Sequence, residues 1–315
     1  MEILLQMVLL VAGFVMLIKG ADWFVEGASK LADRFGIPQL VIGLTIVAMG
    51  TSLPEAAVSI SAAFKGSADI TIGNVVGSNI MNVLVILGLT SVIRAIPVQK
   101  STVRYEIPFV ILMTLILAGL GLYDNRISRP EGVILWAFMI LYLLYLLWCA
   151  KHGTNTSEES EEGKDKGNTA IWKLLLMIVV GALLIVWGSD ITVDAATVIA
   201  QLFGMSERLI GLTIVAFGTS LPELVTSATA AVKGKADIAV GNIVGSNIFN
   251  ILFVVGTTAL ITPVAYSANF LIDSAVAVGA VALLLVCVLP KRKLGRLGGV
   301  LMLLGYAGYF VYLIQ

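Results

Sequence analysis

Two identical hexapeptides, GTSLPE at 50–55 and at 218–223, place a carboxylate, two hydroxyls and a proline inside apolar stretches. In the first copy, Thr51 and Ser52 precede Glu55 by four and three positions. Residues at this spacing lie on one face of a helix, so their oxygens can converge on a common point. The second copy repeats the arrangement with Thr219, Ser220 and Glu223.

A second repeated motif follows each hexapeptide. GNVVGSNIMN occupies 73–82 and GNIVGSNIFN occupies 241–250. The serine and the last asparagine of each copy are four positions apart and share a helical face. Carboxylate, hydroxyl, amide and carbonyl oxygens are the ligands of hard cations such as Na⁺ and Ca²⁺. A structural interpretation, with side chains bonded to their own helix, stays open for these hydroxyls and amides. The four residues are Ser78, Asn82, Ser246 and Asn250.

Nitrogen and sulfur ligands are scarce in this chain. His152 is the only histidine, and it stands at a polar stretch, whereas Cys149 and Cys287 lie in apolar segments. This distribution argues against a zinc site and against a catalytic triad that uses histidine. A serine–carboxylate pair without a nearby base is also a poor basis for a hydrolase. We therefore expect no enzyme and no cofactor.

The elements that carry these motifs are predicted to be transmembrane helices. The chain of 315 residues is 58% hydrophobic and 13% charged, with a mean hydropathy of +0.99, which is too apolar for a soluble fold. Helices satisfy their own backbone in hydrocarbon, and strand-like alternation is absent. We predict an all-α membrane protein with ten spans, at about 3–27, 38–64, 70–93, 105–122, 132–150, 170–198, 207–233, 238–261, 268–289 and 294–314.

Both glutamates then lie near the middle of the bilayer, where an ionised carboxylate needs compensation. No lysine or arginine stands at that depth in any predicted span, and Lys19, the nearest, has Asp22 and Glu26 close by. The missing positive charge is therefore a mobile cation or a proton. Backbone ligands are expected too, because Pro54 and Pro222 remove helix hydrogen bonds and free the carbonyls of Gly50 and Gly218.

The chain is an internal duplication. Residues 43–88 align without a gap to 211–256 at an offset of 168, with roughly two-thirds of the positions identical. We predict a five-helix repeat at 1–150, a linker at 151–169 and a second repeat at 170–315. Five spans per repeat invert the second repeat relative to the first. The offset also relates two further acidic pairs, Asp22 and Glu26 to Asp190 and Asp194, which we expect near the membrane interface, with an access path as the alternative.

Charge predicts the orientation in a cell membrane. Most lysines and arginines fall on the side of the 151–169 segment, so the positive-inside rule places this linker in the cytoplasm and both termini outside. The linker is acidic and lacks the spacing of a calcium-binding loop. We interpret it as a solvated connection.

The paired GTSLPE segments, each followed by GN-x-VGSNI-x-N, resemble the calcium/cation antiporter superfamily, and within it the prokaryotic sodium/calcium exchangers. This resemblance covers nearly the whole chain. It implies ten helices with a broken second and seventh helix, and sliding of the first and sixth helices to switch access. It also implies Glu55 and Glu223 as shared ligands of Ca²⁺ and Na⁺. Further oxygens would come from Thr51, Ser52, Ser78, Asn82, Thr219, Ser220, Ser246 and Asn250, with the backbone carbonyls of Ala48 and Ala216 completing outer Na⁺ sites.

One position departs from part of that family. Asn250 stands where potassium-dependent relatives carry an aspartate, which argues against potassium dependence. The expected function is Ca²⁺ extrusion in exchange for Na⁺, with the bilayer as surroundings and no nucleic acid partner. A Ca²⁺/H⁺ exchanger and a passive cation channel are the alternatives, and the sequence leaves the oligomeric state open.

Overall fold

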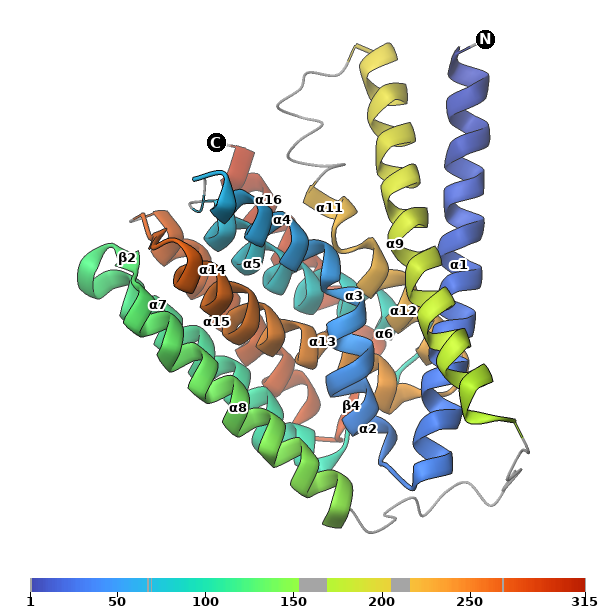
Figure 1. Cartoon of the computed structure of the whole chain (residues 1–315), viewed down its shortest axis with the longest axis horizontal. Coiled ribbons are helices and arrows are strands. Elements are labelled where there is room, and N and C mark those ends of the chain that lie inside the picture. Colours follow the sequence, from blue (N-terminus) through green and yellow to red (C-terminus); the bar gives the residue numbers. More distant parts are fainter. Residues whose placement is uncertain are drawn as a thin grey trace.

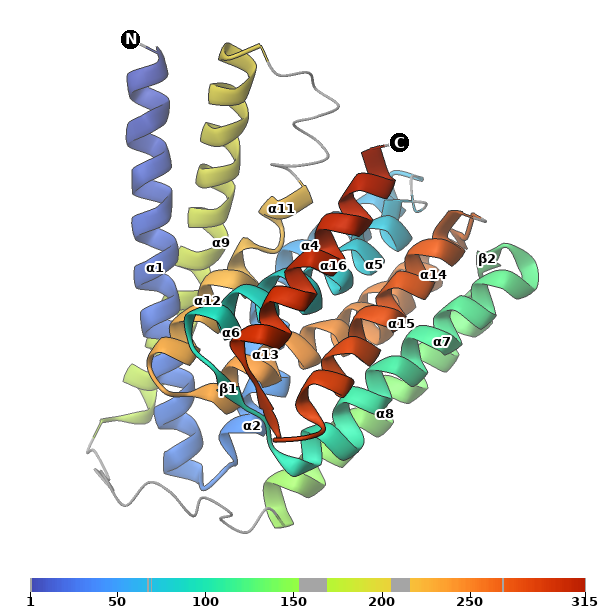
Figure 2. The same cartoon turned by 180° about the vertical axis from the view of Figure 1, so that it is seen from behind.

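The fold is described from a computed structural model, which covers residues 2–66, 68, 70–152, 169–204, 216–267 and 269–314. Almost all of these residues are helical (Figures 1 and 2). Eight helices of the described chain are long and apolar enough to cross a membrane, and a bent pair makes a ninth. The expected all-α membrane architecture is thus confirmed. The predicted span 207–233 lies partly outside the described residues, so a count of ten is not tested.

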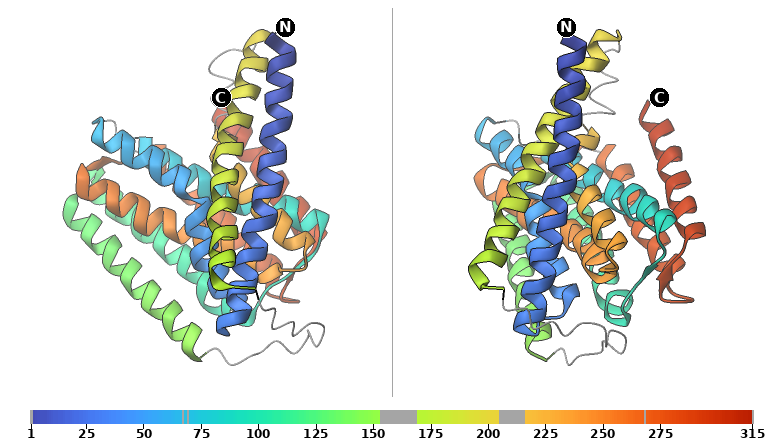
Figure 3. Two further views of the ribbon diagram at one scale, coloured as in Figure 1. Left: turned by 45° about the vertical axis from the view of Figure 1, so that its right-hand side comes forward. Right: turned by 90° about the vertical axis from the view of Figure 1, so that its right-hand side faces the viewer.

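Two long helices, α1 (Glu2–Phe35) and α9 (Ile171–Leu202), lie side by side and run in opposite directions (Figure 1). They stand against one side of the other helices and cross them at an angle (Figure 3). Glycines allow the close approach, because a Cβ on Gly20 would lie 2.8 Å from the carbonyl oxygen of Gly181. One on Gly13 would lie 2.9 Å from that of Gly188. This contact is therefore backbone against backbone, with few protruding side chains.

Both GTSLPE segments interrupt a helix, as the prolines predicted. The first runs through α2 (Gln39–Ile42), η1 (Gly43–Val47) and α3 (Ala48–Thr51) into α4 (Leu53–Phe64). The two segments on either side of Ser52 meet at 48°. In the second copy a turn at Thr219 and Ser220 separates α11 (Ala216–Gly218) from α12 (Leu221–Val232).

The GN-x-VGSNI-x-N segments form the most deeply buried helices. The first contains α5 (Ile70–Met81), η2 (Asn82–Leu87) and α6 (Gly88–Ile93). The second contains α13 (Ala236–Phe249), η5 (Asn250–Val255) and α14 (Gly256–Ile261). Their apolar windows are 72% and 94% buried inside the protein, against 44% at most for the other long helices. A wide π-helical turn begins at the last asparagine of each motif, and such turns occur often at functional sites.

The remaining helices complete the outer layer, and short strands connect some of them. The helical segments are η3 (Thr102–Glu106), α7 (Ile107–Asp124), α8 (Arg129–His152), α15 (Asn269–Val288) and α16 (Arg296–Ile314). The strands, which the sequence did not predict, pair where helix ends run extended beside one another. They are β1 (Ile96–Pro97) with β4 (Lys293–Leu294), and β2 (Arg126–Ile127) with β3 (Val264–Ala265).

Candidate functional site

The two glutamates are completely buried. Glu55 lies in the first turn of α4 and Glu223 in the first turn of α12, and each is 0% exposed. Each therefore follows directly on a helix break, where the amides at the start of a helix favour negative charge. No lysine, arginine or histidine of the described chain forms an ion pair with either carboxylate. Their charge is thus uncompensated by the described side chains.

Hydroxyl groups connect the two glutamates across the two repeats. Ser52, at the first break, donates a hydrogen bond to Oε1 of Glu223 at 2.8 Å. Ser78 of α5 donates to Oε1 of Glu55 at 3.2 Å, and its Oγ is 3.4 Å from Oγ of Ser220 at the second break. The predicted serines and glutamates of both hexapeptides therefore meet in one place.

The other predicted residues surround this group. Thr51 donates to Oδ1 of Asn242 at 2.9 Å and to the carbonyl oxygen of Ala48 at 3.3 Å. Ser246 donates to the same carbonyl at 3.4 Å. The carbonyl of Ala48 therefore already accepts bonds from two predicted ligands. Thr219 is half-buried in the turn, and the backbone of Ala216 begins α11.

An asparagine supports the backbone of each glutamate, and the sequence reasoning did not single out either one. Asn74 donates to the carbonyl oxygen of Glu55 at 3.2 Å and to Oγ of Ser59 at 2.9 Å. The equivalent Asn242 donates to the carbonyl oxygen of Glu223 at 3.4 Å and to Oγ of Ser227 at 2.9 Å. The sequence could have indicated both residues, because each is the first asparagine of a GN-x-VGSNI-x-N motif and they recur at the offset of 168.

Four buried asparagines join α5 with its π-helical continuation η2 to α13 and η5. Asn79 donates to the backbone oxygen of Asn247 at 3.1 Å, and Asn247 donates to that of Asn79 at 3.3 Å. Asn82 donates to Oδ1 of Asn247 at 3.0 Å, and Asn250 donates to Oδ1 of Asn79 at 3.1 Å. Asn79 and Asn247 were also missed from the sequence. They hold Asn82 and Asn250 by the amide nitrogen, and the amide oxygens of these two residues have no hydrogen-bond partner among the described residues.

Four buried oxygens of the predicted ligands have no hydrogen-bond partner among the described residues, namely Oε2 of Glu55 and Glu223 and Oδ1 of Asn82 and Asn250. Six other buried side-chain oxygens, outside the predicted ligand set, also lack one. A buried oxygen without a donor is unfavourable unless a water or a cation meets it. The described chain holds no group of three or more histidines, cysteines or acids, so a cation here is limited to two carboxylates plus neutral oxygens. This composition fits a hard cation.

A family model described as "Sodium/calcium exchanger protein" matches residues 5–148 and 173–315, which is nearly the full length. The chain belongs to the sodium/calcium exchanger family. Members of this family are transporters, and the general activity of the family is the exchange of cations that include Ca²⁺. The expected membership in the calcium/cation antiporters is confirmed.

Individual relatives cover the exchanger from end to end. The inner membrane protein YrbG of Escherichia coli is 39% identical over 314 residues, with 96% of this chain and 95% of the relative covered. The sodium/calcium exchanger MaX1 of Methanosarcina acetivorans is 30% identical over 352 residues, with 99% of each covered. A solved structure of the sodium-calcium exchanger NCX_Mj is 33% identical and superposes with a TM-score of 0.84 over 99% of each chain.

The carbonyl oxygen of Gly218, which Pro222 leaves without its helical hydrogen bond, has a partner in the exchanger. Ser189 of α9 donates a hydrogen bond to the carbonyl oxygen of Gly218 at 2.8 Å. The sequence predicted that this carbonyl would face the break as an ion ligand, and here a hydroxyl of α9 satisfies it. The residue equivalent to Ser189 in the first repeat is Ala21, which has no hydroxyl. The bond thus ties α9 to the second broken helix, and Ala21 cannot form the equivalent bond in the first repeat.

Proposed function

We propose that the exchanger moves Ca²⁺ across the membrane against Na⁺ by alternating access, and that the Na⁺ gradient drives Ca²⁺ out of the cell. One observation carries the proposal. Two fully buried carboxylates, Glu55 and Glu223, each have one oxygen without a partner and no basic residue of the described chain beside them. A transported cation supplies the missing charge.

The charge of the site explains the exchange. Two ionised glutamates carry a charge of about minus two, which one Ca²⁺ balances and which Na⁺ balances only as a group of ions. The two loads need the same oxygens, so they exclude one another. A site emptied of both leaves two buried carboxylates uncompensated, and this cost opposes passage through a closed state without cargo. Antiport without leak follows from these two conditions.

The remaining ligands and the architecture belong to the same proposal. The hydroxyls of Ser52 and Ser78 bond the carboxylates and that of Ser220 contacts Ser78, which supports their role as ligands. Thr51, Ser246, Asn82 and Asn250, with Thr219 and the carbonyls of Ala48 and Ala216, complete the proposed set. Two inverted five-helix repeats, 1–150 and 170–315, would carry it as ten helices, with 151–169 in the cytoplasm and both termini outside.

Alternating access would come from movement of α1 and α9 against the other helices. The backbone contact between Gly20 and Gly181 keeps these two helices together as one unit. The pair packs on the broken helices through Phe24 at Gly50 and Val193 at Gly218, whereas the asparagine bonds hold the central helices to one another. The proposed motion therefore leaves the ligands in place and changes which face reaches them.

Flux into liposomes tests the proposal. Purified protein is reconstituted, and uptake of ⁴⁵Ca²⁺ is measured with Na⁺ inside and Na⁺-free buffer outside. We expect gradient-dependent uptake that Glu55→Gln and Glu223→Gln each abolish. Glu131→Gln is the matched control, because this acid accepts bonds from Ser128 at the start of α8, away from the site. Undiminished uptake in Glu55→Gln or Glu223→Gln contradicts the proposal.

The same vesicles distinguish the alternative couplings. A pH gradient that replaces Na⁺ as the driving force identifies a Ca²⁺/H⁺ exchanger. Uptake that needs no counter-ion identifies a channel. Our expectation is that only an outward Na⁺ gradient drives Ca²⁺ into the vesicles.

A further inference from the structure

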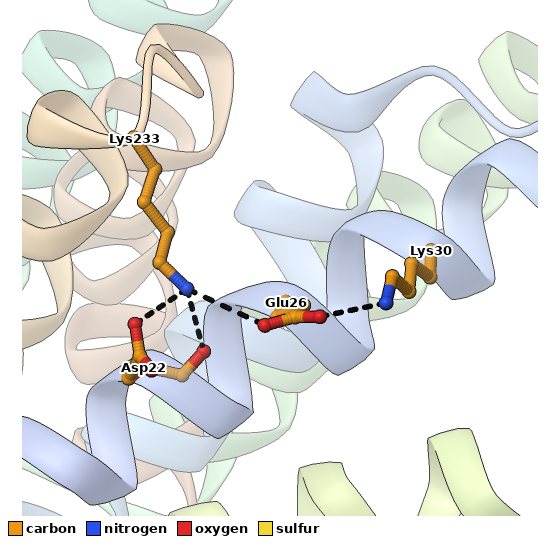
Figure 4. Close-up of polar contacts among 4 residues, drawn as sticks. All are labelled: Asp22, Glu26, Lys30 and Lys233. Carbon is orange, nitrogen blue, oxygen red and sulfur yellow. Dashed lines mark hydrogen bonds and ion pairs between the residues drawn. The ribbon is translucent and has the colours of Figure 1, made fainter. Parts of the chain in front are cut away.

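One ion-pair network links the α1/α9 pair to the central helices, and it is drawn in Figure 4. Lys233, which follows α12, lies 2.6 Å from Oδ1 of Asp22 and 3.7 Å from Oε2 of Glu26 on α1. Its Nζ also donates to the backbone oxygen of Asp22 at 3.1 Å. Glu26 is bound in addition by Lys30, four residues further along the same helix, at 2.6 Å. Lys233 thus fastens α1 to the end of α12.

The duplicated sequence contains the same set of charges a second time. At the offset of 168, Lys233 corresponds to Lys65, and Asp22 and Glu26 correspond to Asp190 and Asp194. Lys65 follows α4 as Lys233 follows α12. In the described chain, neither Asp190 nor Asp194 forms an ion pair with Lys65, and all three residues are exposed. Only one of two equivalent networks is therefore formed.

Lys65 and Lys233 lie at opposite ends of the membrane-spanning helices. Lys65 precedes the span Ile70–Ile93, and Arg94 follows it directly. Arg94 donates to the backbone oxygen of Val232 at 2.7 Å, which places Lys233 at the far end of that span. The formed and the unformed network consequently belong to the two different faces of the membrane.

Packing around the two broken helices shows the same asymmetry. α1 packs along α12, and Ala230 of α12 is 0% exposed in an apolar cluster with residues of α1. Corresponding packing of α9 along α4 is not seen in the described chain. The equivalent surface of α4 is instead open, with Ala62 beside Lys65 in a cavity of about 350 Å³. The asparagine bonds that support the backbone of Glu55 and Glu223 are repeated in both halves, whereas the packing of the α1/α9 pair on the broken helices is not.

We propose that these two networks are alternating latches. Lys233 with Asp22 and Glu26 holds α1 against α12 in the conformation described here, and Lys65 with Asp190 and Asp194 holds α9 against α4 in the opposite one. Each latch closes one face while the other face is open. This inference rests on the proposed alternating access and adds the charges that hold each end state. It also assigns a role to four acids that do not line the ion site.

The strength expected of such a latch suits a transporter. Asp22 and Glu26 keep 38% and 39% of their side-chain surface exposed, so solvent screens the pair. An exposed ion pair of this kind biases an equilibrium by about two- to fivefold. Bonds of that strength favour one state without trapping it, and nearly equal latches on the two faces keep both states accessible.

Cysteine accessibility tests the latches independently of transport. In a background with Cys149 and Cys287 replaced by alanine, Ala62→Cys or Ala230→Cys is introduced, and the alkylation rate with a charged maleimide is measured. The thiol at position 62 is expected to react faster than the thiol at position 230, because Ala62 lines the cavity and Ala230 is buried. Lys233→Gln should shift the ratio of the two rates toward position 230 by about two- to fivefold, and Lys65→Gln should shift it toward position 62.

Two further comparisons make the outcome decisive. Asp22→Asn with Glu26→Gln must act as Lys233→Gln does, and Asp190→Asn with Asp194→Asn must act as Lys65→Gln does. Arg126→Gln is the control, because it breaks a 2.8 Å pair with Asp124 that does not involve α1 or α9. Shifts in the same direction for Lys65→Gln and Lys233→Gln, or shifts no larger than the control, overturn the latches. The alkylation assay applies no ion gradient, so it tests the latches without measuring transport. A lack of Na⁺-driven uptake of ⁴⁵Ca²⁺ in liposomes would instead count against the proposed function.

Discussion

Ser52 and Glu223 belong to different repeats, yet their side chains are joined by a hydrogen bond of 2.8 Å. The hydroxyl comes from the turn that breaks the first helix, and the carboxylate comes from the first turn after the break in the second. The first broken helix thus supplies a hydrogen bond to the acid of the second. Substitutions in one half should therefore change ion binding by the other.

We predict that Ser52→Ala weakens Ca²⁺ binding about tenfold. The substitution removes a proposed ligand oxygen from the site, and the loss of a polar partner at a buried charge costs about 1–3 kcal/mol. The concentration of Ca²⁺ for half-maximal exchange in liposomes measures the effect. Ser91→Ala is the control, because Ser91 is equally buried and bonds the carbonyl oxygen of Gly88 on its own helix. Equal affinities for Ser52→Ala and Ser91→Ala would contradict this prediction.

Asn79→Leu and Asn247→Leu should destabilise the protein by similar amounts. Each substitution deletes an amide that donates to the opposite backbone and accepts from a further asparagine. A buried group left without its partner costs about 1–3 kcal/mol. Thermal unfolding in detergent measures the loss for each variant. A clear drop in midpoint for one of the two variants alone would show that the network is not shared equally.

Calcium removal should lower thermal stability through the two glutamates. A ligand that binds only the folded state stabilises it by about 2.7 kcal/mol at a concentration one hundred times its Kd. We expect the unfolding midpoint to rise with added Ca²⁺ and to fall again with a chelator. The double variant Glu55→Gln with Glu223→Gln should lose this response, because its site carries no negative charge. A preserved response would place the stabilising Ca²⁺ elsewhere.

Gly20→Ala should impair the contact between α1 and α9. The added Cβ would lie 2.8 Å from the backbone oxygen of Gly181, and overpacking of this kind costs about 1–3 kcal/mol. The matched control is Gly119→Ala in α7, where a Cβ meets nothing within 4 Å. Exchange rates and unfolding midpoints are measured for both. We expect losses for Gly20→Ala and an unchanged or raised midpoint for Gly119→Ala, since alanine favours helix. The reverse order would refute close backbone packing.

Much of the fold was predictable because hydrophobic length and proline position act locally. A run of apolar residues long enough for the bilayer becomes a helix, and Pro54 and Pro222 interrupt it where they stand. The short paired strands were not predictable. Their pairing depends on which helix ends become neighbours, and Ile96 meets Leu294 from the far end of the chain.

The candidate site also contains residues that the sequence identified and residues that it did not. The repeated spacing of Ser52 and Glu55 identified polar groups that the structure brings together. The roles of Asn79 and Asn247 depend on which helix lies opposite, and spacing within one motif carries no information on that. The bond from Ser189 to Gly218 was equally hidden, because Ser189 has no counterpart in the other repeat to draw attention to it.

The asparagine network obeys the rule of an isologous interface, in which residue i touches j and j touches i. Asn79 and Asn247 bond each other's backbone. Asn82 donates to the side chain of Asn247, and Asn250 donates in the same way to that of Asn79. Two identical subunits make reciprocal contacts of this kind, and here both partners belong to one polypeptide. A change at Asn79 or Asn247 therefore removes bonds from both helices, so we expect compensating changes at these positions to occur in pairs.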